Sequence, residues 1–201
     1  GKLLSQNLFE LTASRLFNDH TIAAKSLIIG SPELTNNGIV QGNNALQLTS
    51  RNVLNGQPGQ IVSGAGLVLN LDKLENHGLL LVNNGFTLEG AQLSNVGNIQ
   101  ADSVNLQMRD ALNNQGQILA KHDALVSAAT LENDGSLAAQ NMTLSGTSIR
   151  NGGLVQGNDN ASVTAGILTT NPAGRWLAGK ALTMDASLVD NTGMMQGDTI
   201  A

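Results

Sequence analysis

The stretch that decides the fold is a nine-residue motif that occurs four times in succession, as LENHGLLLV at 74–82, LSNVGNIQA at 93–101, LNNQGQILA at 112–120 and LENDGSLAA at 131–139. The interval between one copy and the next is constant. Each copy places Leu, Asn, Gly, an aliphatic residue and a small residue or Val at alternate positions. Alternation with period 2 is typical of a β-strand, and self-similarity at a fixed period of about 20 residues is typical of a solenoid.

The same columns extend over most of the chain. The glycine of the motif recurs nine times at nearly equal intervals, at Gly38, Gly59, Gly78, Gly97, Gly116, Gly135, Gly153, Gly174 and Gly193. A second alternating apolar pair follows in most units, and Asn, Gly and Thr are poor helix formers. We therefore predict an all-β fold, a right-handed parallel β-helix (β-solenoid) of about ten coils with a ~19-residue repeat.

The regular columns suggest how the chain is divided. Residues 34–201 follow the pattern, whereas residues 1–33 match it weakly and are expected to form an irregular or degenerate coil. Because the chain stops after the first strand of a unit, we interpret 34–201 as a fragment of a longer array. The two longest units carry insertions that contain Pro58 and Pro172. Beside the second insertion Trp176 replaces an aliphatic residue, and we expect it to fill the core there.

The Asn two residues before the glycine predicts a structural ladder. An inward-facing Asn at a corner can bind backbone groups and pass its amide to the Asn of the next coil. The following glycine would permit either a positive φ or a close approach of the chain. We expect the ladder to be disturbed at the two insertions, before Gly59 and Gly174. Its consecutive rungs are predicted to be Asn76, Asn95, Asn114, Asn133 and Asn151.

Composition excludes several classes of function. Ten basic residues stand against 15 acidic ones without a basic cluster, which argues against nucleic-acid binding. No apolar run approaches the ~18 residues of a membrane-spanning helix. The absence of Cys excludes disulfides, thiol catalysis and thiolate metal sites. We expect a monomeric rod without a cofactor.

No catalytic or metal-binding constellation is predicted. Cleavage of a polysaccharide needs two or three carboxylates that converge on one groove, whereas the acids here fall in different columns. The three histidines, His20, His77 and His122, occupy different slots in non-adjacent coils, so a metal site is not expected. A polysaccharide-binding or polysaccharide-cleaving β-helix is the alternative to a structural role.

Two outward-facing features stand out among the polar residues. Val62, Leu79 and Leu81 should cluster on adjacent coils and form a candidate interaction face, or a seat for a flanking segment. Glu132 and Arg150 should be neighbours on successive coils. An exposed ion pair of this kind stabilises a fold by ~0–1 kcal/mol at most.

The recurring cores LENHG, LSNVG, LNNQG, LENDG, IRNGG and LVDNTG, each with an aliphatic residue two positions after its glycine, resemble haemagglutinin repeats. Such repeats belong to filamentous-haemagglutinin-like exoproteins of two-partner secretion systems. Within that group the likeness is greatest to the repeat shaft of contact-dependent growth inhibition proteins. The resemblance covers residues 16–201.

The resemblance implies a secreted protein of the bacterial cell surface, a structural filament or adhesin segment without enzymatic activity. Proteins of this family pass through an outer-membrane β-barrel transporter and fold outside the cell into a β-helical filament. The filament presents a receptor-binding region to a neighbouring cell and delivers a C-terminal toxin. Neither the amino-terminal secretion motif nor the marker that precedes the toxin occurs here, so neither activity is expected of this chain.

Overall fold

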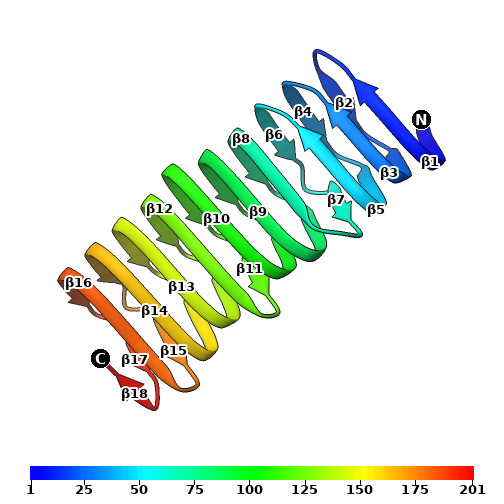
Figure 1. Ribbon diagram of the computed structural model, residues 1–201. Helices are drawn as coiled ribbons and strands as arrows, with labels where there is room; N and C mark the ends of the chain where they lie inside the picture. The colour runs from blue at the N-terminus through cyan, green and yellow to red at the C-terminus, as the bar shows by residue number, and fades with distance from the viewer.

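The computed structural model describes all 201 residues and is a straight stack of coils with the two termini at opposite ends (Figure 1). It contains strands and no helix, so no segment forms a helix that could cross a membrane. The strands are β1 (Lys2–Thr12), β2 (Leu16–Asn18), β3 (Thr21–Gly30), β4 (Glu33–Asn36), β5 (Ile39–Thr49), β6 (Asn52–Asn55), β7 (Gln60–Ser63), β8 (Leu67–Asn76), β9 (Leu79–Asn95), β10 (Asn98–Asn114), β11 (Gln117–Ala120), β12 (Asp123–Asn133), β13 (Ser136–Asn151), β14 (Leu154–Thr170), β15 (Arg175–Ala178), β16 (Ala181–Asn191), β17 (Met194–Gln196) and β18 (Thr199–Ile200). All pair in parallel, and the predicted parallel β-helix of about ten coils is confirmed.

One coil has three faces, and the pairing of β9 with β10 defines them. The first face holds residues 79–82 against 98–101, the second 85–90 against 103–108, and the third 92–95 against 111–114. Register shifts separate the three blocks, because the chain bends at each corner. Since equivalent residues of successive coils are hydrogen-bonded neighbours, each sequence column becomes a row along the rod at the strand spacing of about 4.8 Å.

The core is a single apolar column inside the three faces. All 44 buried apolar residues belong to one continuous cluster. Leu80, Ile99 and Ile118 succeed one another on the first face, and each is completely buried. Each such side chain contributes roughly 1.5–3 kcal/mol by burial. Trp176, also completely buried, occupies the same row beside the second insertion, as predicted.

The glycine column is required by close approach of successive coils. No glycine in the chain has a positive φ, so the conformational freedom of glycine is not what the corner uses. A Cβ added at Gly97 or at Gly116 would lie 2.1 Å from the carbonyl oxygen of the equivalent glycine in the preceding coil. Any side chain there would force the coils apart, which explains why the column is glycine in every unit from Gly38 onward.

Residues 1–33 stack on the rest of the rod. β1 pairs with β3 across nine register partners, with one shift between Ser5 and Leu8. β2 pairs with β4, which places Asn18 beside Asn36. Ile22, Leu27 and Ile29 of β3 are buried in the common core.

Candidate functional site

The most regular feature of the molecule is a row of buried asparagines at the corner after the third face. Each side-chain Nδ2 donates a hydrogen bond of 2.7–2.8 Å to Oδ1 of the asparagine in the next coil. Seven such bonds join eight residues, which are Asn18, Asn36, Asn55, Asn76, Asn95, Asn114, Asn133 and Asn151. All eight are buried, and no buried side-chain polar atom in the structure lacks a partner.

The ladder also joins side chains to the backbone and has a direction. Nδ2 of Asn95 donates to the backbone carbonyl of Gln117 in the next coil at 3.2 Å, and Nδ2 of Asn114 donates to that of Ser136 at 3.2 Å. Every amide therefore points its donors toward the C-terminal end of the rod. Each rung provides hydrogen-bond partners for polar groups that burial would otherwise leave without them. The ladder therefore stabilises the stacking of one coil on the next.

The expected disturbance of the ladder at Gly59 is wrong. Asn55 takes the place of the rung and bonds Asn36 and Asn76 at 2.8 Å on either side. The two extra residues lie after the rung and bulge outward, where Gly59 N–H closes the loop on the Gly56 carbonyl at 2.8 Å. The sequence held the signal, because Val53 and Asn55 preserve the apolar-x-Asn spacing when the unit is aligned on its strand and not on its glycine.

At the second insertion the row changes its chemistry. Thr170 is the register partner of Asn151 and is equally buried. Its Oγ1 accepts a hydrogen bond of 2.9 Å from the indole Nε1 of Trp176, while Asn151 still donates to the Arg175 carbonyl at 3.1 Å. The row of asparagine-to-asparagine bonds thus ends here, with Trp176 supplying the polar partner that Thr170 needs.

The three residues of the candidate interaction face lie together on the first face. Val62 of β7 is the direct register partner of Leu81 in β9, and Leu79 is two residues before Leu81. All three are half-buried. The patch is bounded along the rod by polar register partners, Gln41 on one side and Asn98 on the other. It is therefore a small apolar cluster, on a face whose outward rows also hold Ile39, Leu119 and Leu154 as separate apolar residues.

An ion cluster reinforces the ladder corner between the rungs Asn133 and Asn151. The Arg150 guanidinium forms two hydrogen bonds with Asp134, at 2.9 and 2.7 Å, and one with Glu132 at 3.4 Å. The hydrogen bond from Arg150 holds the pKa of Asp134 below its usual value, against the effect of burial. Sequence reasoning expected the neighbour Glu132 but missed Asp134, which reaches Arg150 from the turn before the next glycine. Arg150 therefore links its own coil to the preceding coil, which carries Glu132 and Asp134.

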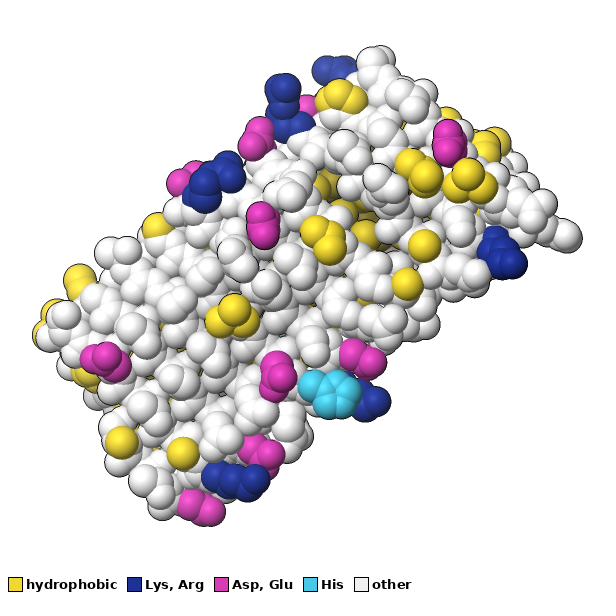
Figure 2. Space-filling model, viewed as in Figure 1, with side chains coloured by type: hydrophobic (Ala, Val, Ile, Leu, Met, Phe, Trp, Pro, Cys, Tyr) yellow, Lys and Arg dark blue, Asp and Glu magenta, His cyan; other side chains and the backbone are white.

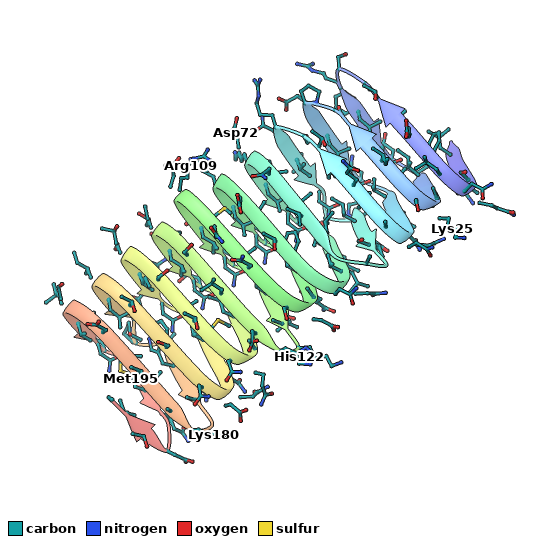
Figure 3. All side chains as sticks on the ribbon, in the orientation of Figure 1. Lys25, Asp72, Arg109, His122, Lys180 and Met195 are labelled. Atoms are coloured by element: carbon teal, nitrogen blue, oxygen red, sulfur yellow. The ribbon has the colours of Figure 1, made fainter.

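Ionisable groups elsewhere do not converge. No three His, Asp or Glu side chains lie close enough together to hold a metal ion. His20, His77 and His122 are all exposed, and Figure 3 shows His122 on the opposite edge of the rod from Asp72 and Arg109. Figure 2 shows most of the charged side chains along the two long edges of the rod, with few of them and several separate hydrophobic side chains on the face between.

Comparison with known proteins finds two proteins to which the chain is similar. Over its whole length the chain is 29% identical to a protein of Enterobacter cloacae named 16S rRNA endonuclease CdiA. Over 78 residues, 39% of the chain, it is 32% identical to the tRNA nuclease CdiA of Yersinia mollaretii. The chain fits the repeat shaft of a CdiA-type, filamentous-haemagglutinin-like protein.

The CdiA-type likeness concerns a small part of very long proteins. The chain spans 6% of the length of the first relative, and the match to the second covers 3% of that protein. No family model matches the chain, and no solved structure matches it. The predicted resemblance is confirmed at the level of the CdiA-type repeat.

Proposed function

We propose that this chain is a non-enzymatic shaft segment of a secreted exoprotein of the bacterial cell surface, a rigid spacer that holds receptor-binding and toxin regions away from the producing cell. The observation that carries the proposal is the uninterrupted stack itself. Eight linked asparagines and one continuous core run along the rod.

The nuclease names of the two relatives belong to those proteins as a whole. The matched segment is a repeat in which polar side chains at the most regular position are neutral amides, fully engaged with one another. An amide held in this way supplies no nucleophile and no general base. This supports a mechanical role for the segment.

Partners follow from the same proposal. During export the unfolded chain would pass through an outer-membrane transporter, and the absence of Cys is compatible with threading a narrow pore. Outside the cell, the half-buried Val62, Leu79 and Leu81 patch would contact a receptor on a neighbouring cell. Replacing Leu79 and Leu81 by Ser should then weaken binding of the exoprotein to target cells without lowering its thermal stability by more than a few degrees. Unchanged cell binding would reject the patch as a contact surface.

Deletion of whole coils tests the spacer role in the exoprotein that carries this segment. Removing residues 79–135 joins Gly78 to Ser136, which has the same position in its coil as Leu79, and takes out three coils. The filament should shorten by about 14 Å in electron micrographs, from three strand spacings, while export and target-cell binding persist. A matched deletion of residues 79–126 removes a non-integral number of repeats and should disrupt folding. If the three-coil deletion is exported but no longer binds target cells, the segment is a binding region and not a spacer.

A further inference from the structure

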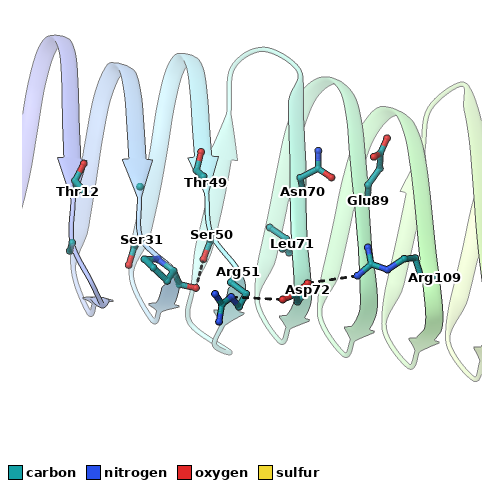
Figure 4. A pocket seen from close by; sticks show the side chains of 13 residues that line it. Thr12, Ser31, Thr49, Ser50, Arg51, Asn70, Leu71, Asp72, Glu89 and Arg109 are labelled. Atoms are coloured by element: carbon teal, nitrogen blue, oxygen red, sulfur yellow. Dashed lines mark hydrogen bonds and ion pairs between the residues drawn. The ribbon is translucent and has the colours of Figure 1, made fainter.

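A groove lined mainly by polar residues runs lengthwise along the corner between the second and third faces, over the first half of the rod. It has a volume of about 570 Å³ and is lined by strands of six successive coils, β1, β3, β5, β8, β9 and β10, and by the turns that follow β1, β3 and β5. Figure 4 shows these strands side by side, with the lining residues Thr49, Asn70 and Glu89 in one row and Ser50, Asp72 and Arg109 in a row below them. Five strand spacings give it a length of about 24 Å.

The charged groups in the groove are only loosely paired. Asp72 stands between two arginines, with Oδ2 at 3.9 Å from Nε of Arg51 and Oδ1 at 3.7 Å from Nη2 of Arg109. Both distances are too long for hydrogen bonds, and the three side chains are 60–69% exposed. The guanidinium groups of the two arginines and the Asp72 carboxylate are therefore close together, and their donors and acceptors remain available to hydrogen-bond a ligand.

The composition of the groove selects among ligand classes. Only two of its 13 lining residues are hydrophobic, so it offers no apolar pockets for the side chains of a peptide. Arg51 and Arg109 are offset by Asp72 and Glu89, so it has no net positive charge to attract a polyanion. Mixed planar donors and acceptors, spaced along an extended channel, suit a chain of vicinal hydroxyl groups. We propose that this groove binds an extended, uncharged oligosaccharide, with Asp72 accepting and Arg109 donating hydrogen bonds to adjacent sugar hydroxyls.

The test uses the full chain and a panel of immobilised neutral hexasaccharides of glucose, mannose, galactose and N-acetylglucosamine, with an alginate hexasaccharide as the anionic probe. At least one neutral hexasaccharide should bind with a dissociation constant in the millimolar range or below, and its disaccharide should bind at least about tenfold more weakly. Asp72→Asn and Arg109→Gln should each weaken binding about tenfold, as expected for loss of a hydrogen bond to a charged group. Arg175→Gln, at an exposed arginine on the first face, is the matched control and should change binding less than twofold.

Three results would overturn the proposal. One is that no neutral hexasaccharide binds, and another is that only the alginate probe binds. The third is that binding is equal in wild type, Asp72→Asn and Arg109→Gln. Circular dichroism spectra identical to wild type would show that each variant keeps the β-helix, since exposed ion pairs contribute little to stability. The outcome is independent of the shaft role, because a spacer without a glycan groove would pass the coil-deletion test unchanged.

Discussion

Replacement of Asn114 by Ala removes one rung from the middle of the ladder, three coils before the row reaches Thr170. The wild-type side chain accepts a 2.8 Å bond from Asn95 and donates bonds of 2.8 Å to Asn133 and 3.2 Å to the Ser136 carbonyl. Three hydrogen bonds at about 1 kcal/mol each, together with about 1–2 kcal/mol for the buried Asn133 oxygen left unpaired, give an expected loss of about 4–5 kcal/mol.

The measurement is the free energy of unfolding from urea titrations followed by circular dichroism. Asn113→Ala is the matched control, because Asn113 is the exposed neighbour on the same strand and a surface change there should stay within about 0.5 kcal/mol. Since each coil of a solenoid contacts only its neighbours, hydrogen exchange should locate the damage. The amides of Gly116 and Gln117, which bond the preceding coil at 3.0 and 2.9 Å, should exchange faster. A loss below about 1 kcal/mol, or equal effects of the two variants, would refute the cohesive role of the ladder.

The other predictions concern the corners of the coils. Gly116→Ala should lower the free energy of unfolding by at least about 2–3 kcal/mol, because the added Cβ would lie 2.1 Å from a backbone oxygen. Gly85→Ala is the control, because a Cβ there meets nothing within 4 Å, and it should be neutral or stabilising by up to about 1 kcal/mol in the same urea assay. Thr170→Val should lower the free energy of unfolding by about 1–3 kcal/mol, because it leaves the buried indole N–H of Trp176 without an acceptor. Thermal unfolding followed by Trp fluorescence should show a lower melting temperature, and an unchanged one would argue against this bond. The pKa of Asp134 is lowered in the folded state, so the stabilisation by its carboxylate should be complete above its unfolded pKa of about 3.9 and disappear as the pH falls through the lowered value. Because the pair is partly exposed, Asp134→Asn should remove no more than about 1 kcal/mol at pH 7, and the effect should shrink as the pH is lowered below the unfolded pKa. An effect that does not change with pH would contradict the assignment.

The ladder and the core could be read from the sequence because both depend on columns that repeat every coil. Asn95, Asn114 and Asn133 recur at equal intervals along the chain, and identical spacing places identical side chains above one another. Asn55 does not stand two residues before its glycine, because the inserted residues lie between Asn55 and Gly59. Spacing from the glycine therefore does not identify Asn55 as a rung. Sequence spacing does not reveal on which side of a rung an inserted loop leaves the coil.

The groove could not be predicted from the columns for a related reason. Arg109 reaches Asp72 across two coils, and a bulge between Met108 and Ala111 puts Arg109 and Asp110 opposite the single residue Ala91. The repeat period carries no information about such a contact, which depends on side-chain length and on a local irregularity. The same holds for Asp134, which lies in a turn and reaches Arg150 beside the predicted neighbour Glu132.

Distances between spin labels test the stacking of coils most directly, and the Cys-free chain allows labels to be placed through single introduced cysteines. Thr35, Glu132 and Asp190 occupy one outward row of the third face, five and eight coils apart from the first of them. Double electron–electron resonance spectroscopy should give about 24 Å between labels at positions 35 and 132, and about 38 Å between labels at positions 35 and 190. The two distances should have the same ratio as the numbers of coils between the labels. Distances that do not grow in this proportion would contradict a rod in which each repeat lies directly on the one before it.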